Sequence, residues 1–146
     1  MGIIGRVTQG TVGNLSEIAP EELKSEFGEF LMKDETIKTG FKLIRDVVIF
    51  TDKRIIDIDK QGATGQKARI TSIYLDSIIN VTVETSGFGI DDSEIGIDYI
   101  SSPYYRSNGG VTVSQRKFEF PKKYNVAELY IWLSEAAYAN HLHINK

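Results

Sequence analysis

The 146-residue chain contains no cysteine. Disulfide frameworks, thiol nucleophiles and zinc or iron–sulfur sites held by thiolates are therefore excluded. Basic residues are also scarce for a binder of polyanions, because 17 Lys and Arg stand against 20 Asp and Glu and the formal net charge is -3. A general binder of nucleic acid or of anionic membranes carries a strong positive field, which this balance does not supply. We therefore expect no nucleic-acid partner.

Long apolar runs are missing as well. No stretch approaches the roughly 20 residues that span a bilayer. Met1–Arg6 has neither the basic start nor the apolar run of a secretory signal. We therefore expect a cytoplasmic protein. At roughly 150 residues per domain, and with no internal repeat, the sequence predicts a single domain over 1–146.

Apolar residues recur with helical spacing near both ends of the chain. Pro20 suits the first turn of a helix, and the residues after it predict a helix over about 20–33. Asn125 suits an N-cap, and the apolar stripe that follows it predicts a helix over about 126–140.

Between these helices, over about 36–120, the apolar period changes from 3.6 to 2. Clusters of Asp, Gly, Asn and Ser divide this region into about seven short strands. Such a series of short strands with one covered face describes a small barrel or a sandwich. The expected strands are about 38–43, 47–50, 56–59, 69–74, 79–84, 95–99 and 111–120.

The last of these strands changes phase along its length. Val111 and Val113 are odd-numbered, whereas Phe118 and Phe120 are even-numbered. Because side chains alternate between the two faces of a strand, a β-bulge near Ser114 would bring all four to one face.

The motifs that usually carry chemistry are incomplete. Gly62–Lys67 resembles a phosphate-binding loop, but it has two residues between its glycines where that loop has four. His141 and His143 stand near the end of the chain without the further ligands that a metal site needs, so we interpret them as surface residues. The carboxylates around Asp91 follow glycines and suit a solvated hairpin tip. We therefore expect no metal, no cofactor and no catalytic group.

The expected C-terminal helix carries a second apolar face. Ile131 and Tyr138 lie seven residues apart opposite the core stripe, and Trp132 lies on the flank. We interpret these three residues as candidates for an oligomer interface, because a monomer would leave them in water. In the alternative interpretation, Trp132 and Tyr138 cover the edge of the barrel.

Charge is unevenly distributed along the chain. There is no Lys or Arg from Ile70 to Tyr105, whereas Arg116–Lys123 holds four basic residues and one acidic residue. An acidic and a basic region on one subunit favour head-to-tail association, and such contacts close into rings.

Three sequence blocks, Ile44–Ile56, Asp59–Gly65 and Val83–Gly87, together resemble the bacterial pleckstrin-homology-like (PH-like) domain family. The resemblance extends over roughly Glu17–Ala137 and implies a mainly β fold, a seven-stranded, partly open antiparallel barrel capped by a C-terminal α-helix. It also implies homo-oligomeric rings of cyclic symmetry, a polar surface that binds other proteins, and no enzymatic activity.

The polar residues at the motif positions would form that protein-binding surface. In a purely structural alternative, Asp52 makes a tight turn and Arg45 and Asp46 form local ion pairs. The motif residues are Arg45, Asp46, Asp52, Arg54, Gln61, Thr64 and Lys67.

We therefore expect a non-enzymatic interaction module that forms a cyclic homo-oligomeric ring and binds an unidentified protein. A hypothesis of a different class is a peripheral binder of anionic lipid or another anionic ligand. Its basic residues would be Lys38, Lys42 and Arg45, which lie around the first hairpin.

Overall fold

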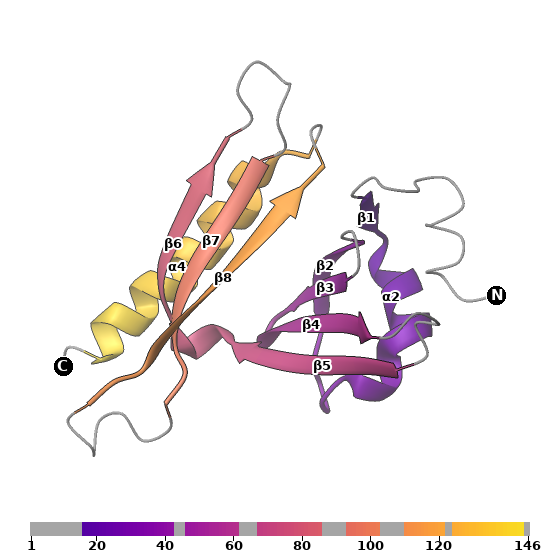
Figure 1. Cartoon of the computed structure of the whole chain (residues 1–146), viewed down its shortest axis with the longest axis horizontal. Helices are drawn as coiled ribbons and strands as arrows, with labels where there is room; N and C mark the ends of the chain where they lie inside the picture. Colours follow the sequence, from indigo (N-terminus) through magenta and orange to yellow (C-terminus); the bar gives the residue numbers. More distant parts are fainter. Residues whose placement is uncertain are drawn as a thin grey trace. The chain divides into compact units, whose positions relative to one another are not determined.

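The computed structural model describes residues 16–42, 46–61, 67–85, 93–102, 110–121 and 124–144. The fold is mainly β, with eight antiparallel strands in two sheets, a short N-terminal helix and a long C-terminal helix (Figure 1). Among the described residues, neither sheet closes on itself through strand pairing. The chain divides into two compact units, Met1–Ile73 and Tyr74–Lys146, which are described in turn.

The first unit contains a five-stranded sheet of order β1-β2-β3-β4-β5. Strands β2 to β5 confirm four of the predicted strands, whereas β1 spans three residues and is too short to show an alternating pattern. The strands are β1 (Ser16–Ile18), β2 (Ile37–Lys42), β3 (Asp46–Thr51), β4 (Arg54–Gln61) and β5 (Lys67–Tyr74).

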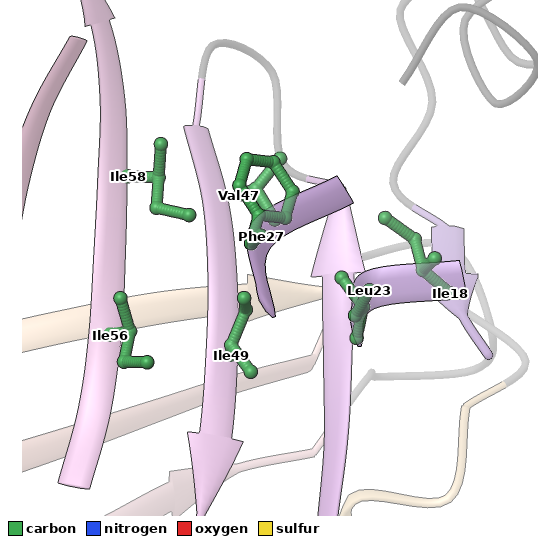
Figure 2. Close-up of a cluster of buried hydrophobic side chains, with 7 residues drawn as sticks. All are labelled: Ile18, Leu23, Phe27, Val47, Ile49, Ile56 and Ile58. Atoms are coloured by element: carbon green, nitrogen blue, oxygen red, sulfur yellow. The ribbon is translucent and has the colours of Figure 1, made fainter. Parts of the chain in front are cut away.

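A cluster of buried apolar side chains joins one face of this sheet to helix α2, Pro20–Phe27 (Figure 2). The helix approaches β2 closely at Gly40, where an added Cβ would meet the side chain of Leu23 and would lie 3.1 Å from the carbonyl oxygen of Val48. A residue without a side chain is therefore needed at this position. The cluster consists of Ile18, Leu23, Phe27, Val47, Ile49, Ile56 and Ile58.

Helix α2 ends at Phe27 rather than near residue 33. A short 3₁₀ turn, η1 (Gly28–Phe30), follows it, and Phe30 is 44% exposed. Leu31 follows this turn in an extended conformation and still packs against the buried cluster, so the core contact expected of a longer helix is made outside the helix.

The second unit contains a three-stranded sheet of order β6-β7-β8, with bounds Ile78–Glu84, Ser93–Ile100 and Val113–Phe120. The β7–β8 ladder runs from Ser93 opposite Phe120 to Ile100 opposite Val113 without a register shift. The predicted bulge near Ser114 is therefore wrong. The change of phase is instead tolerated because Val113 is 48% exposed and needs no place in the core.

Helix α4 (Val126–Ile144) begins at the predicted N-cap, where Asn125 Oδ1 accepts a hydrogen bond of 3.0 Å from the Ala127 amide. The helix continues to Ile144, beyond the predicted end near 140. Asn140 Nδ2 donates to the carbonyl oxygens of Leu75 and Ile78, at 2.7 and 2.8 Å, and so ties the last turns of α4 to the start of the sheet.

Candidate functional site

Residues 50–54 (FTDKR) of the first sequence block form the turn of the β3–β4 hairpin, and their arginine lies inside the protein. Arg54 is 8% exposed, and its guanidinium forms a two-point ion pair with Glu35, with Nε 2.9 Å from Oε2 and Nη2 3.0 Å from Oε1. Nη2 also donates to the Phe30 carbonyl at 2.6 Å, and Nη1 donates to Ser72 Oγ at 2.7 Å. The arginine thus joins η1, the turn before β2, and strands β4 and β5.

The Glu35 carboxylate is held as an anion by several donors. Thr51 Oγ1 donates to Oε2 at 2.6 Å, and the Met32 amide donates to Oε1 at 2.7 Å. Burial raises the pKa of Glu35, but these hydrogen bonds, those of Arg54 and the Arg54 charge outweigh it and lower the pKa to about 2. The carboxylate therefore stays ionised across the physiological pH range.

A tight turn brings Glu35 to this position. The Glu35 amide donates to the Met32 carbonyl at 3.1 Å, and Asp34 in the middle of the turn has a φ of 60°. Aspartate is among the few non-glycine residues that adopt this left-handed conformation readily.

Asp52 also makes contacts within the hairpin region. Its Oδ1 accepts a hydrogen bond of 2.8 Å from the Thr36 amide, and its own amide donates to the Thr36 carbonyl at 3.0 Å. The contacts of Asp52 thus agree with the structural alternative. Because Arg54 is buried, we leave it out of any partner-binding surface.

Three of the remaining motif residues lie at the other end of the sheet. Asp46 begins β3, Gln61 ends β4 and Lys67 begins β5. Because neighbouring strands run antiparallel, these three positions lie at the same end of the sheet. Arg45 and Thr64 lie outside the described residues, as does the side chain of Gln61. The six residues of β3 separate this end of the sheet from the turn at Asp52 by roughly 17–20 Å. Asp46 and Asp52 therefore do not lie in one surface patch.

The lysines proposed for anion binding do not lie together on the surface. Lys38 is exposed, but Lys42 is only 9% exposed. Burial lowers the pKa of Lys42, the neighbouring charge of Lys60 lowers it further, and Asp46 opposes the shift. A buried ammonium is poorly placed to receive a lipid phosphate.

Helix α4 presents an exposed apolar stripe on the side away from its buried residues. Ile131 is 52% exposed and Tyr138 is 66% exposed, in agreement with the second face predicted from sequence, and Trp132 is half-buried. Leu142, at 53%, extends the stripe by one turn. Sequence reasoning missed Leu142 because the predicted helix ended at 140, and a longer helix would have included it.

Sequence reasoning also missed the hydrogen-bond partners of Arg54, namely Glu35, Thr51 and Ser72. The only signal for Glu35 was that an acidic residue comes just before the first predicted strand. Its separation of 19 residues from Arg54 gave no reason to pair the two. In the part of the chain that the structure describes, no group of three or more His, Asp or Glu side chains could hold a metal ion. Among the same residues, no helix has the length and apolar character to cross a membrane.

Comparison with known proteins places this arrangement in a family. The family model described as bacterial PH domain matches residues 6–137. The uncharacterized protein YjqA of Bacillus subtilis (strain 168) is 42% identical over 88 residues, which cover 60% of this chain and 70% of YjqA.

Solved structures agree with the family model. A DUF1696-family protein with a pleckstrin-homology domain from Shewanella loihica PV-4 has 30% identity and a TM-score of 0.64, with 85% of this chain and 97% of that chain covered. A pleckstrin-homology domain from Shewanella amazonensis SB2B has 30% identity and a TM-score of 0.56, covering 84% and 90%.

A third structure supports the fold at lower identity. A PH-domain-containing protein from Exiguobacterium sibiricum 255-15 has 20% identity and a TM-score of 0.65, with 85% of this chain and 62% of that chain covered, and this likeness shows the fold alone. Two sheets, a C-terminal helix and the match of nearly the whole chain lead to one conclusion: the chain belongs to the bacterial PH-domain family.

Proposed function

We propose that this PH-like domain is a non-enzymatic interaction module, located in the cytoplasm, that self-associates into a cyclic ring and binds another protein. The observation that carries the proposal is the apolar stripe on α4, in which Ile131, Tyr138 and Leu142 are each more than half exposed. Full burial of such a side chain contributes about 1.5–3 kcal/mol. A second copy of the chain, with its own apolar stripe, is the occupant that we propose.

Self-complementarity of the stripe supports this occupant. If two α4 helices pair antiparallel about the middle of the stripe, Ile131 of one copy comes opposite Leu142 of the other, and Tyr138 comes opposite Glu135. Apolar side chains then meet each other, and the tyrosine hydroxyl has a carboxylate to donate to. This contact is two-fold and joins two copies, so a ring with more copies needs a second contact between such pairs. Trp132, on the flank, lies at the rim of the same contact.

Sedimentation velocity tests the self-association. We expect the wild-type chain to sediment as a species heavier than the 16.4 kDa monomer. The double variant Ile131→Glu/Tyr138→Glu places two charges in the stripe and should sediment as a monomer. Thr71→Glu is the matched control, because Thr71 is exposed on β5 in the first unit, and it should stay assembled. A monomeric wild type, or a double variant that still assembles, would refute the proposal.

The observed charge distribution favours an apolar contact over a head-to-tail electrostatic one. The basic strand β8 lies next to the acidic strand β7 in the same sheet, and Lys117 Nζ lies 3.4 Å from Glu94 Oε1. These charges partly neutralise each other within one subunit. We therefore expect the assembly to change little with salt, because screening weakens exposed ion pairs but not apolar burial.

The protein-binding surface that we propose is the end of the five-stranded sheet that holds Asp46, Gln61 and Lys67. It includes the motif positions Arg45 and Thr64. Its support is the topology, which brings the start of β3, the end of β4 and the start of β5 together. Lys67→Glu should abolish capture of the partner in a pull-down from the native cell and leave sedimentation unchanged, whereas loss of assembly would show that the residue serves the ring.

Binding of anionic lipid is the alternative function, and it has weaker support because Lys42 is buried. If it applies, the chain should sediment with vesicles of phosphatidylserine at low salt, and Lys38→Glu should weaken this. Absence of co-sedimentation at low salt would rule out the alternative.

A further inference from the structure

The outer face of the three-stranded sheet contains a small pocket that the proposals above do not use. Its volume is about 250 Å³, which lies below the roughly 300–1,000 Å³ of pockets that enclose a whole small-molecule ligand. Its lining includes Thr82, Glu84, Glu94, Gly96, Asp98 and Lys117. We call it the Gly96 pocket.

The missing side chain of Gly96 explains the hollow. Gly96 lies in β7, the central strand, with Thr82 of β6 on one side and Lys117 of β8 on the other in the same row of the sheet. An added Cβ would find Lys117 Cγ at 3.7 Å, which is ordinary contact. The space above Gly96 is thus open, and its two neighbours form walls.

This face is directed to solvent. Thr82 and Glu84 on β6 and Gln115 and Lys117 on β8 are exposed, whereas Ile97, one position along β7, is buried on the opposite face. Because helix α4 packs against this sheet, it lies on the face with the buried side chains, away from the Gly96 pocket. The pocket and the α4 stripe are therefore separate surfaces.

Three carboxylates and two basic residues line the pocket. Arg116 is opposite Ile97 in the β7–β8 ladder, and its guanidinium carbon lies 5.0 Å from the centroid of the Phe118 ring. Glu94 lies two residues before Gly96 on β7 and pairs with Glu84 of β6. Asp98 lies two residues after Gly96 on the same strand. Lys117 forms an ion pair with Glu94, but its side chain is 70% exposed, so it is weakly held. Asp98 Oδ2 accepts a hydrogen bond of 3.2 Å from Asn80 Nδ2, which holds the carboxylate in one orientation.

From this geometry we propose that the Gly96 pocket receives an arginine or lysine side chain from a basic segment of a partner protein. Three carboxylates around a hollow of side-chain size suit a guanidinium or ammonium group, and a carboxylate accepts a guanidinium with two parallel hydrogen bonds. The flat sheet around the hollow offers room for the rest of the segment. Lys117 then acts as an internal competitor, which leaves Glu94 when the partner's cation enters.

The test is a titration of the wild-type protein with the end-blocked peptide Ala-Ala-Arg-Ala-Ala, followed by amide chemical shifts. We expect saturable shifts at Gly96, Thr82 and Gln115. The matched control peptide replaces arginine with citrulline, which keeps the shape and removes the charge, and it should produce no saturable shift.

Three variants separate this site from general attraction to an acidic surface. Gly96→Val fills the hollow without changing the charge and suits a strand, so it should abolish binding. Glu94→Gln should weaken binding by about twofold to fivefold, the range of an exposed ion pair. Lys117→Ala should strengthen it by about the same factor, because the competing ammonium is removed.

Two outcomes would overturn the proposal. The first is equal binding of the arginine and citrulline peptides. The second is unchanged binding to Gly96→Val with an amide spectrum that still shows a folded protein, because the cation would then not occupy the pocket. Since the α4 stripe lies on another surface, Ile131→Glu/Tyr138→Glu should leave the titration unchanged, and failure of either proposal can be told from failure of the other.

Discussion

In the first unit the most prominent charged pair, Glu35 and Arg54, is buried, whereas in the second unit charged side chains occupy one open face of the sheet. The first arrangement uses nearly all donors of its guanidinium within the chain. The second leaves carboxylates at the rim of a hollow. The recognisable FTDKR segment thus makes its contacts within the fold, whereas the charged side chains around Gly96 stay open to solvent.

Breaking the buried pair gives the largest effect that we expect. Glu35→Ala leaves the Arg54 charge buried without its partner and should lower the free energy of unfolding by about 3–5 kcal/mol. Urea denaturation measures this. The exposed pair in the second unit is the contrast, and Lys117→Ala should cost less than about 1 kcal/mol. Similar losses at both sites would remove the distinction between the units.

The same pair predicts a pH dependence. The pKa of Glu35 is lowered from 4.5 to about 2 on folding, so protonation favours the unfolded chain. The stabilisation, about 3 kcal/mol, is fully present above pH 4.5 and is lost as the pH falls toward about 2.

Urea midpoints across this pH interval measure the effect. The double variant Glu35→Leu/Arg54→Met replaces the pair with apolar groups and should show a flatter dependence. If the double variant and the wild type lose stability in parallel, other carboxylates account for the acid sensitivity.

Close packing of α2 on the first sheet provides a smaller test. Gly40→Ala drives a Cβ into Leu23 and should cost about 1–3 kcal/mol. Gly28→Ala is the matched control, because Gly28 has a right-handed helical φ of -57° and an added Cβ would be 3.7 Å from Lys24 Cγ. The control should be neutral or stabilising by less than about 1 kcal/mol in thermal denaturation. Equal stability of the two variants would contradict the close approach.

Removing the buried lysine should have the smallest effect and the opposite sign. Burial lowers the pKa of Lys42, which means that its charge costs free energy in the folded protein. Lys42→Met keeps the length of the side chain and should raise the free energy of unfolding by about 1 kcal/mol. A loss of stability would show that the Lys42 charge has a favourable partner.

The sequence predicted the fold well where periodicity determines structure. The seven predicted strands correspond to β2 to β8, and Asn125 is the N-cap of α4 as predicted. Strand β1 and the position of Glu35 escaped prediction for a different reason. Both depend on pairing between segments 19 or more residues apart, as with Glu35 and Arg54, and Glu17 opposite Phe41. A local sequence pattern does not show which distant segments of the chain pair.

The candidate surfaces also differ in whether the sequence alone could predict them. Ile131 and Tyr138 could be predicted because helical spacing alone places them opposite the core stripe. The Gly96 pocket could not, because Thr82, Gly96 and Lys117 come together only through the register of three strands. Arg54 shows the opposite error, since a recognisable polar residue was expected at a surface and is buried.

Trp132, the single tryptophan of the chain, offers the most direct test of self-association through α4. It is half-buried on the flank of the stripe, so an assembled interface should shield it from water. Fluorescence emission should shift to longer wavelength as the wild-type protein is diluted, and Ile131→Glu/Tyr138→Glu should show the shifted emission at every concentration. Emission that is independent of concentration in the wild type and identical in the double variant would contradict the account.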